Sequence, residues 1–167
     1  MYKLSLRMQL IYDHLLPEHP VWDFCCDHGY MGLNAYASEC FSEVHFVDQV
    51  PSIISRLQSR FHKEYYQPHH PTQAYFYAQK GEEILSPICG TLVIAGVGAL
   101  NIYKILCELH QRGVLQTQRM ILGPQRDEKK LHDLLREKLF STKQWKLYEH
   151  QVMERGRVRK LLILDKN

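Results

Sequence analysis

The sequence predicts an α/β domain with a mostly parallel sheet and one antiparallel addition at its C-terminal end. Short apolar runs alternate with amphipathic segments along most of the 167 residues, as in strands joined by helical crossovers. The last two β-type runs, at 145–154 and 158–164, instead follow one another across an Arg155-Gly156 turn, which is typical of a hairpin. Because the chain has ordinary domain length and no repeat or linker, it predicts a single domain over 1–167.

An N-terminal helical extension is predicted at residues 1–17. Ser5 is a candidate N-cap, and the apolar residues Leu6, Leu10 and Ile11 recur behind it at helical spacing. The charged and polar residues inside this stretch indicate an amphipathic helix and argue against a signal peptide.

The other elements are predicted from apolar runs and from the prolines and glycines that bound them. Strands are predicted at 21–24, 43–48, 74–78, 91–95 and 119–122. Helices are predicted between and after them, at 31–40, 51–60, 99–112 and 127–140. The proline- and histidine-bearing stretch 62–73 predicts a loop.

Composition excludes several classes of protein. With 45% hydrophobic and 23% charged residues the chain is globular, not disordered, and no apolar run reaches the roughly 20 residues that span a bilayer. Five cysteines without a CxxC motif predict reduced thiols in the cytoplasm. The histidines at 62–70 lack cysteine or acidic partners at regular spacing, so no metal is expected. A net charge of +3 permits an anionic partner without requiring one.

Ligands of such sheets bind beyond the carboxyl ends of the strands. The CCDHG loop at 25–29, which follows the first strand, is therefore a candidate ligand-binding site. Gly29 permits close backbone approach, and the helix after it offers free N–H groups. Asp48 closes the next strand 21 residues after Asp27 (48 − 27 = 21), the offset at which an acid reaches a ribose. The alternative, that Asp48 caps the following helix, has the same weight as ribose binding. The G-x-G-x-x-G and P-loop motifs are absent, which argues against dehydrogenases and NTPases.

Two further strand-to-loop junctions, at 95–99 and 122–125, lie at the same predicted edge. Gly96 and Gly98 follow the most apolar strand and indicate either a sharp bend or a backbone close to a ligand. Tyr30 is a candidate for stacking on a base, although a rim aromatic is the simpler reading of it.

In this order the motifs resemble the bacterial tRNA adenine-22 N1-methyltransferases. The resemblance rests on DxxxDHGY at 23–30, the acid at 48, IAGxG at 94–98 and ILxPQ at 121–125. It extends from about Leu4 to Leu164. It implies a Rossmann-like methyltransferase fold with a seven-stranded sheet, S-adenosylmethionine as cofactor, and tRNA as partner.

Carried over position by position, the resemblance implies functional residues of three kinds. The implied cofactor-binding residues are Asp23, Cys25, Cys26, Gly29, Asp48, Gln49, Gln79, Lys80, Gly96 and Gly98. Asp27 is implied to lie nearest the chemistry, with His28 as its helper. Substrate contacts are implied for Tyr30, Pro124 and Gln125.

The chain departs from the family at three places. Cys25 stands where the family has glycine, and Lys80 stands where it has an acid that can contact the cofactor's adenine, so that Glu82 or Gln79 would have to substitute. The family's helical coiled-coil extension is expected to be absent, since the sequence ends at Asn167. These departures keep two alternatives open: a catalytically degenerate binding protein, and a methyltransferase with a substrate other than RNA.

Overall fold

A computed structural model describes residues 1–139, 144–154 and 156–167. Within these ranges seven strands form one sheet, in the order β3-β2-β1-β4-β5-β7-β6. The first five strands run parallel, whereas β7 is antiparallel to both of its neighbours. Their bounds are β1 Val21–Phe24, β2 Glu43–Asp48, β3 Gln73–Ala78, β4 Thr91–Ala95, β5 Arg119–Gly123, β6 Trp145–Glu154 and β7 Arg157–Lys166. The predicted fold class is therefore confirmed; Arg155 of the predicted turn lies outside the described residues.

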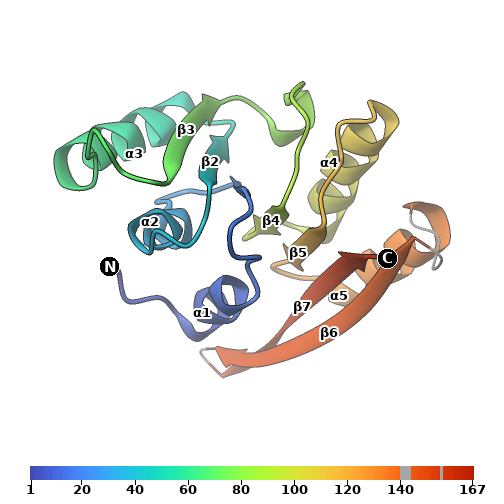
Figure 1. Cartoon of the computed structure of the whole chain (residues 1–167). Coiled ribbons are helices and arrows are strands. Elements are labelled where there is room, and N and C mark those ends of the chain that lie inside the picture. Colours follow the sequence, from blue (N-terminus) through green and yellow to red (C-terminus); the bar gives the residue numbers. More distant parts are fainter. Residues whose placement is uncertain (140–143, 155) are drawn as a thin grey trace.

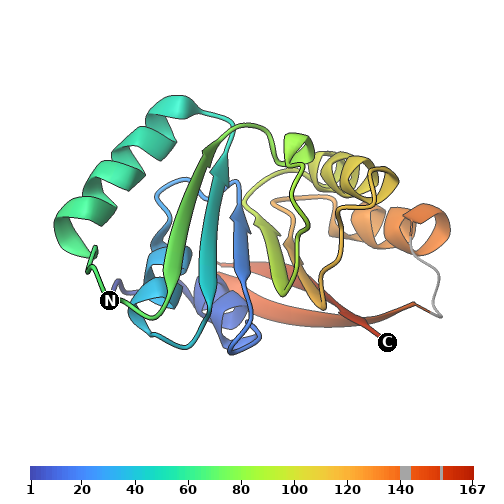
Figure 2. The ribbon, with the colours of Figure 1, turned by 45° about the horizontal axis from the view of Figure 1, so that its top comes forward.

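Helices cover both faces of the sheet (Figures 1 and 2). They are α1 Leu6–Asp13, α2 Tyr30–Ala37, α3 Pro51–Glu64, α4 Ala99–Gln111 and α5 Glu128–Leu134, which continues into a π-helical turn over Leu135–Leu139. The first three pack on one face and the last two on the other. In β4, Leu92 and Ile94 enter the α4–α5 core while Val93 enters the opposite core, which explains why this strand is apolar throughout.

Three helix boundaries differ from the prediction. Helix α3 continues to Glu64 because Phe61, one turn after Leu57, extends its buried face. Helix α2 ends at Ala37, and Glu39 two residues later has a left-handed φ of 59°. The helix predicted at 127–140 changes to a π-helical turn after Leu134, and residue 140 lies outside the described ranges. No helix in the described part of the chain is both long and apolar enough to cross a membrane.

The inward face of α1 also differs from the prediction. Ser5 does cap the helix, since its Oγ accepts from the Met8 N–H at 3.3 Å. The buried side chains, however, are Arg7 and Ile11, while Leu6 is 67% exposed. The helix is turned so that the Arg7 guanidinium donates to the carbonyl oxygen of Gly123 at the end of β5.

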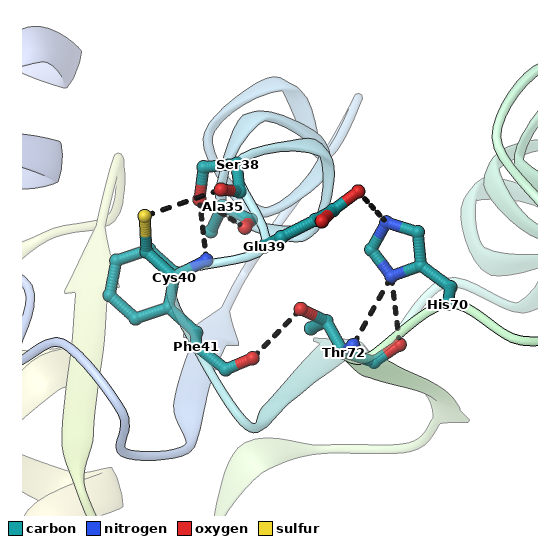
Figure 3. A network of polar contacts seen from close by, with 7 residues as sticks. All are labelled: Ala35, Ser38, Glu39, Cys40, Phe41, His70 and Thr72. Carbon is teal, nitrogen blue, oxygen red and sulfur yellow. Dashed lines mark hydrogen bonds and ion pairs between the residues drawn. The ribbon is translucent and has the colours of Figure 1, made fainter.

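Side-chain contacts tie together the loops at the amino ends of β2 and β3 (Figure 3). His70 Nε2 lies 3.8 Å from a Glu39 carboxylate oxygen, and the Thr72 hydroxyl donates to the Phe41 carbonyl at 2.8 Å. The His70 ring also stacks on Tyr36, with centroids 3.8 Å apart. These contacts give His70 a structural role at the edge opposite the carboxyl ends of the strands.

Candidate functional site

The CCDHG loop folds tightly against the end of β2. Three of its residues have left-handed backbones: Cys25 (φ 58°), Asp27 (φ 49°) and Gly29 (φ 66°). The Cys26 N–H donates to the Val47 carbonyl at 3.2 Å, and the Gly29 N–H donates to the Cys26 carbonyl at 2.7 Å. Because a left-handed backbone favours glycine, Cys25 adopts a conformation that is unfavourable for a residue with a Cβ.

Asp48 caps the helix that follows it, which is one of the two interpretations that the sequence left open. It is buried at the end of β2, and its Oδ1 accepts from the N–H of Val50, the N-cap of α3, at 2.9 Å. Its Oδ2 accepts from the Asp27 N–H at 3.4 Å. The carboxylate thus joins α3 to the CCDHG loop and retains lone pairs for a ligand.

A cavity of about 500 Å³, here called the Asp48 cavity, opens at this point. Its lining includes Cys25, Asp48, Gln49, Lys80 and Glu82. Gln79 is not among the residues that line it.

The Asp48 cavity contains a second acid, Glu82. Its side chain is 16% exposed and pairs with Lys104 at 3.2 Å. Burial raises the pKa of Glu82, but its own backbone N–H and Lys104 outweigh burial and lower the pKa overall. Lys80 is instead 54% exposed and lies 3.9 Å from Glu83.

A second cavity, of about 370 Å³, lies on the other side of Cys25 and is here called the Asp27 cavity. Most of the predicted residues of the first loop line it together: Asp23, Cys25, Cys26, Asp27, His28, Gly29 and Tyr30, with Gly96. Arg7 of α1 and Glu154 of β6 complete its wall. Cys25 lines both cavities, so the two meet at the carboxyl end of β1, beside the switch point between β1 and β4.

The buried acid of the Asp27 cavity is Asp23. Burial raises the pKa of Asp23 to about 7, a donated hydrogen bond from the Gly32 N–H opposes this, and the nearby Asp48 charge adds to it. Burial likewise raises the pKa of the Cys25 thiol to about 12. The thiols next to the site are therefore un-ionised, which argues against a nucleophilic cysteine.

Asp27 and His28 stand at the mouth of the Asp27 cavity. Their side chains are 69% and 63% exposed, and Asp27 Oδ1 lies 3.9 Å from His28 Nε2. The His28 ring stacks near Tyr30, with centroids 5.4 Å apart. Arg60 donates to the His28 carbonyl and lies over the Tyr30 ring, 5.3 Å from its centroid. A basic side chain therefore borders the two candidate catalytic residues.

Besides Gln79, three predicted residues line neither cavity. Gly98 is the N-cap of α4. Pro124 is buried and Gln125 is exposed. The Gln125 N–H donates to the Val97 carbonyl at 2.9 Å, which ties the loop after β5 to the loop after β4.

The sequence analysis did not identify Arg7 as a site residue. Its position four residues before Ile11 could have indicated it, because this spacing places a charged side chain on the buried face of an amphipathic helix. Glu154 was missed because no local pattern shows that the tip of β6 reaches the carboxyl ends of the parallel strands.

Residues 4–162 match the family model described as a methyltransferase domain. The chain belongs to the methyltransferase domain family. No curated protein matches the chain by sequence.

Solved structures of RNA methyltransferases share the fold. The Bacillus subtilis M1A22 tRNA methyltransferase TrmK is 19% identical, with a TM-score of 0.81 over 100% of this chain and 68% of its own. Mycoplasma capricolum TrmK in complex with S-adenosylhomocysteine is 17% identical, with a TM-score of 0.80 over 99% of this chain and 70% of its own. A Streptococcus thermophilus rRNA methylase is 14% identical, with a TM-score of 0.66 over 99% and 98% of the two chains.

Proposed function

We propose that this methyltransferase domain transfers the methyl group of S-adenosylmethionine to N1 of an adenine in tRNA. The observation that carries the proposal is the pair of cavities that meet at Cys25. One of them holds a strand-end acid suited to a ribose, and the other holds Asp27, His28 and Tyr30. The likeness to tRNA methyltransferase structures supports the choice of RNA as substrate.

The residues of the Asp48 cavity fit an adenosine. The Asp48 carboxylate retains acceptor capacity for two ribose hydroxyls, and Gln49 lies beside it. The Glu82 carboxylate, held by Lys104, accepts from the exocyclic amine of the adenine and replaces the acid missing at Lys80. S-adenosylmethionine, when bound, supplies a methyl group that its sulfonium makes electrophilic.

Asp27 has the position for the chemistry on the acceptor. A bond from adenine N1 to the methyl carbon leaves a positive charge on the ring as the carbon–sulfur bond breaks. The exposed Asp27 carboxylate stabilises this charge and accepts the proton that the exocyclic amine then releases. His28 lies beside this carboxylate, with its Nε2 3.9 Å from Asp27 Oδ1, and Tyr30 offers a ring on which the base stacks.

Arginines of α3 supply contacts for the RNA backbone. Arg56 and Arg60 line a third hollow, of about 220 Å³, together with Asp27 and His28. Phosphates placed there bring an extruded nucleotide to the mouth of the Asp27 cavity. Phosphate contacts of this kind give a binding constant that falls steeply with salt.

The first test is calorimetric titration with S-adenosylhomocysteine, followed by incubation of tRNA with methyl-labelled cofactor. We expect micromolar binding, label in the RNA, and a reverse-transcription stop at one adenine, because N1 methylation blocks base pairing. Asp27→Asn should keep cofactor binding and lose methyl transfer by about 100-fold or more. Arg112→Met, far from the site on the exposed end of α4, serves as the control for non-specific effects.

Other outcomes would select the alternatives. Cofactor binding without methyl transfer to any RNA would favour a binding protein. The strained backbone of Cys25 is an observation that supports this alternative. Label in protein or in a small molecule would overturn RNA as substrate while leaving the methyltransferase activity in place. Absence of cofactor binding at millimolar ligand would overturn the proposal altogether.

A further inference from the structure

A row of aromatic rings, here called the aromatic track, leads away from the mouth of the Asp27 cavity. It consists of His28, Tyr30, Tyr2 and Tyr65, all at least partly exposed. The centroids of His28 and Tyr30 are 5.4 Å apart. Those of Tyr30 and Tyr2 are 4.6 Å apart, and those of Tyr2 and Tyr65 are 6.2 Å apart. Each separation lies within the range of aromatic contacts, so the rings form one continuous surface that begins at a candidate catalytic residue.

Tyr2 is fixed at the centre of the aromatic track. It lies in the irregular segment before α1, which passes beside the C-terminal end of α3 (Figure 2). Its N–H donates to Asn34 Oδ1 at 2.7 Å, and its carbonyl accepts from Asn34 Nδ2 at 2.8 Å. Asn34 is itself 5% exposed on α2. A buried amide therefore holds the Tyr2 backbone through two hydrogen bonds, which leaves a half-exposed ring preorganised for a ligand.

Unpaired positive charge adjoins these rings. The guanidinium carbon of Arg60 lies 5.5 Å from the ring centroid of Tyr2 and 5.3 Å from that of Tyr30. The buried Nε of Arg60 has no hydrogen-bond partner among the described residues. In the part of the chain that the structure describes, neither Arg60 nor Arg56, one turn before it on α3, forms an ion pair with a carboxylate. Both charges are therefore available to an anion.

The combination of rings and unpaired arginines matches a single-stranded nucleotide. The base has a flat face that stacks on an aromatic ring, and the phosphate carries the charge that an arginine binds. Within a duplex each base is covered on both faces by its neighbours, so only an unpaired nucleotide offers a free face. The surface beside the Asp27 cavity thus favours single-stranded over double-stranded RNA.

We infer that the aromatic track binds the unpaired nucleotides next to the target adenine, with one neighbouring base stacked on Tyr2. The inference rests on the proposed function and adds the secondary structure of its substrate: the adenine is taken from a loop or bulge. With the target base on Tyr30, the chain of nucleotides continues over Tyr2 toward Tyr65. Its phosphates then pass Arg60.

An RNA series on the unmodified protein is the first test. A short RNA strand with one adenine is compared with the same strand annealed to its complement, and with strands that carry an abasic site beside the adenine. Fluorescence anisotropy in the presence of S-adenosylhomocysteine should show about tenfold or more weaker binding to the duplex. An abasic neighbour on one side of the adenine should weaken binding by about fivefold or more. Equal affinity for strand and duplex would overturn the inference.

Variants then assign the stacking to Tyr2. Tyr2→Leu removes the ring and keeps the backbone bonds to Asn34, and should weaken binding of the intact strand by about fivefold or more. Tyr2→Phe keeps the ring and loses only the hydroxyl bond to Glu64, and should bind like the parent. Tyr148→Leu is the matched control, since Tyr148 is 38% exposed on β6 at the opposite edge of the sheet, and it should not change RNA binding.

A double-mutant cycle separates stacking from a structural effect. If a base stacks on Tyr2, the abasic strand should bind Tyr2→Leu and the parent with affinities within about twofold of each other. Calorimetric binding of S-adenosylhomocysteine should be unchanged in Tyr2→Leu. Equal losses for the intact and abasic strands, or a matching loss of cofactor binding, would make Tyr2 purely structural and overturn the inference.

Failure of the inference differs from failure of the proposed function. Equal rates of methyl transfer to strand and duplex would keep the proposed function and overturn the inference. Selective binding of the single strand without methyl transfer to any RNA would overturn the proposed function and support the track as a surface for unpaired nucleotides.

Discussion

Asp23 links the site to pH. Its native pKa of about 7 lies above the ordinary value of 3.8, so between these values the native state holds a proton that the unfolded state has released. Stability therefore falls as pH rises from about 4 to about 7 and is flat above. The full loss is on the order of 4 kcal/mol. We expect chemical denaturation of the ligand-free protein at pH 5 and pH 8 to show this fall.

Asp23→Asn separates this contribution from other titrating groups. The amide cannot ionise, so the variant should lose most of the fall between pH 5 and pH 8 and be more stable than the parent at pH 8. Its affinity for S-adenosylhomocysteine should decrease, because Asp23 lines the Asp27 cavity and is one of the residues that the resemblance implies for cofactor binding. A variant that kept the parent's pH dependence would show that another group causes it.

Cys25 has a strained backbone at a position between the two cavities. Its left-handed backbone costs about 1 kcal/mol, and its side chain borders both cavities. Cys25→Gly should therefore leave the free energy of unfolding within about 1 kcal/mol of the parent, since glycine's added entropy offsets the relieved strain, and should tighten S-adenosylhomocysteine binding. Cys26→Gly, at the buried neighbour, is the control and should destabilise. Equal losses in the two variants would contradict the account.

At the scale of elements, the approach of α2 to β2 depends on Gly32. A Cβ at this position would overlap the ring of Phe46, which is fully buried and has no room to move. Gly32→Ala should lower the free energy of unfolding by about 1 to 3 kcal/mol through overpacking, measured by denaturant titration. Gly98→Ala, where a Cβ meets nothing within 4 Å, should stay close to the parent, and a similar loss there would refute the packing explanation.

At the scale of the whole molecule, the hairpin is joined to the parallel sheet by Arg119 and Asp165. The two are cross-strand partners of β5 and β7 and form a bidentate pair at 2.6 and 2.8 Å. Asp165→Asn should lower stability by about 1 to 2 kcal/mol. Glu149→Gln breaks the more exposed pair with Lys160 and should change stability by less than about 0.5 kcal/mol. Thermal melts that ranked the two variants in the opposite order would contradict this.

Much of the candidate site was readable in the sequence because its residues cluster in two short loops. DxxxDHGY at 23–30 and the acid at 48 follow consecutive parallel strands, whose carboxyl ends meet at one edge. The sequence left Glu82 and Gln79 as alternatives for the acid missing at Lys80, and only Glu82 lines the Asp48 cavity. The choice depends on how the 3-10 turn Gly81–Glu83 directs each side chain.

The sequence by itself determined the order of strands and helices and the edge at which the site lies. Apolar periodicity, prolines and glycines act locally, over a few residues, so those features need no knowledge of distant contacts. Only the tertiary structure decided which side chains share a cavity. Arg7 and Glu154 are far apart in the chain, yet both line the Asp27 cavity, because α1 packs against β6 at the end of the sheet formed by the hairpin (Figure 1). Long-range packing of that kind leaves no local pattern.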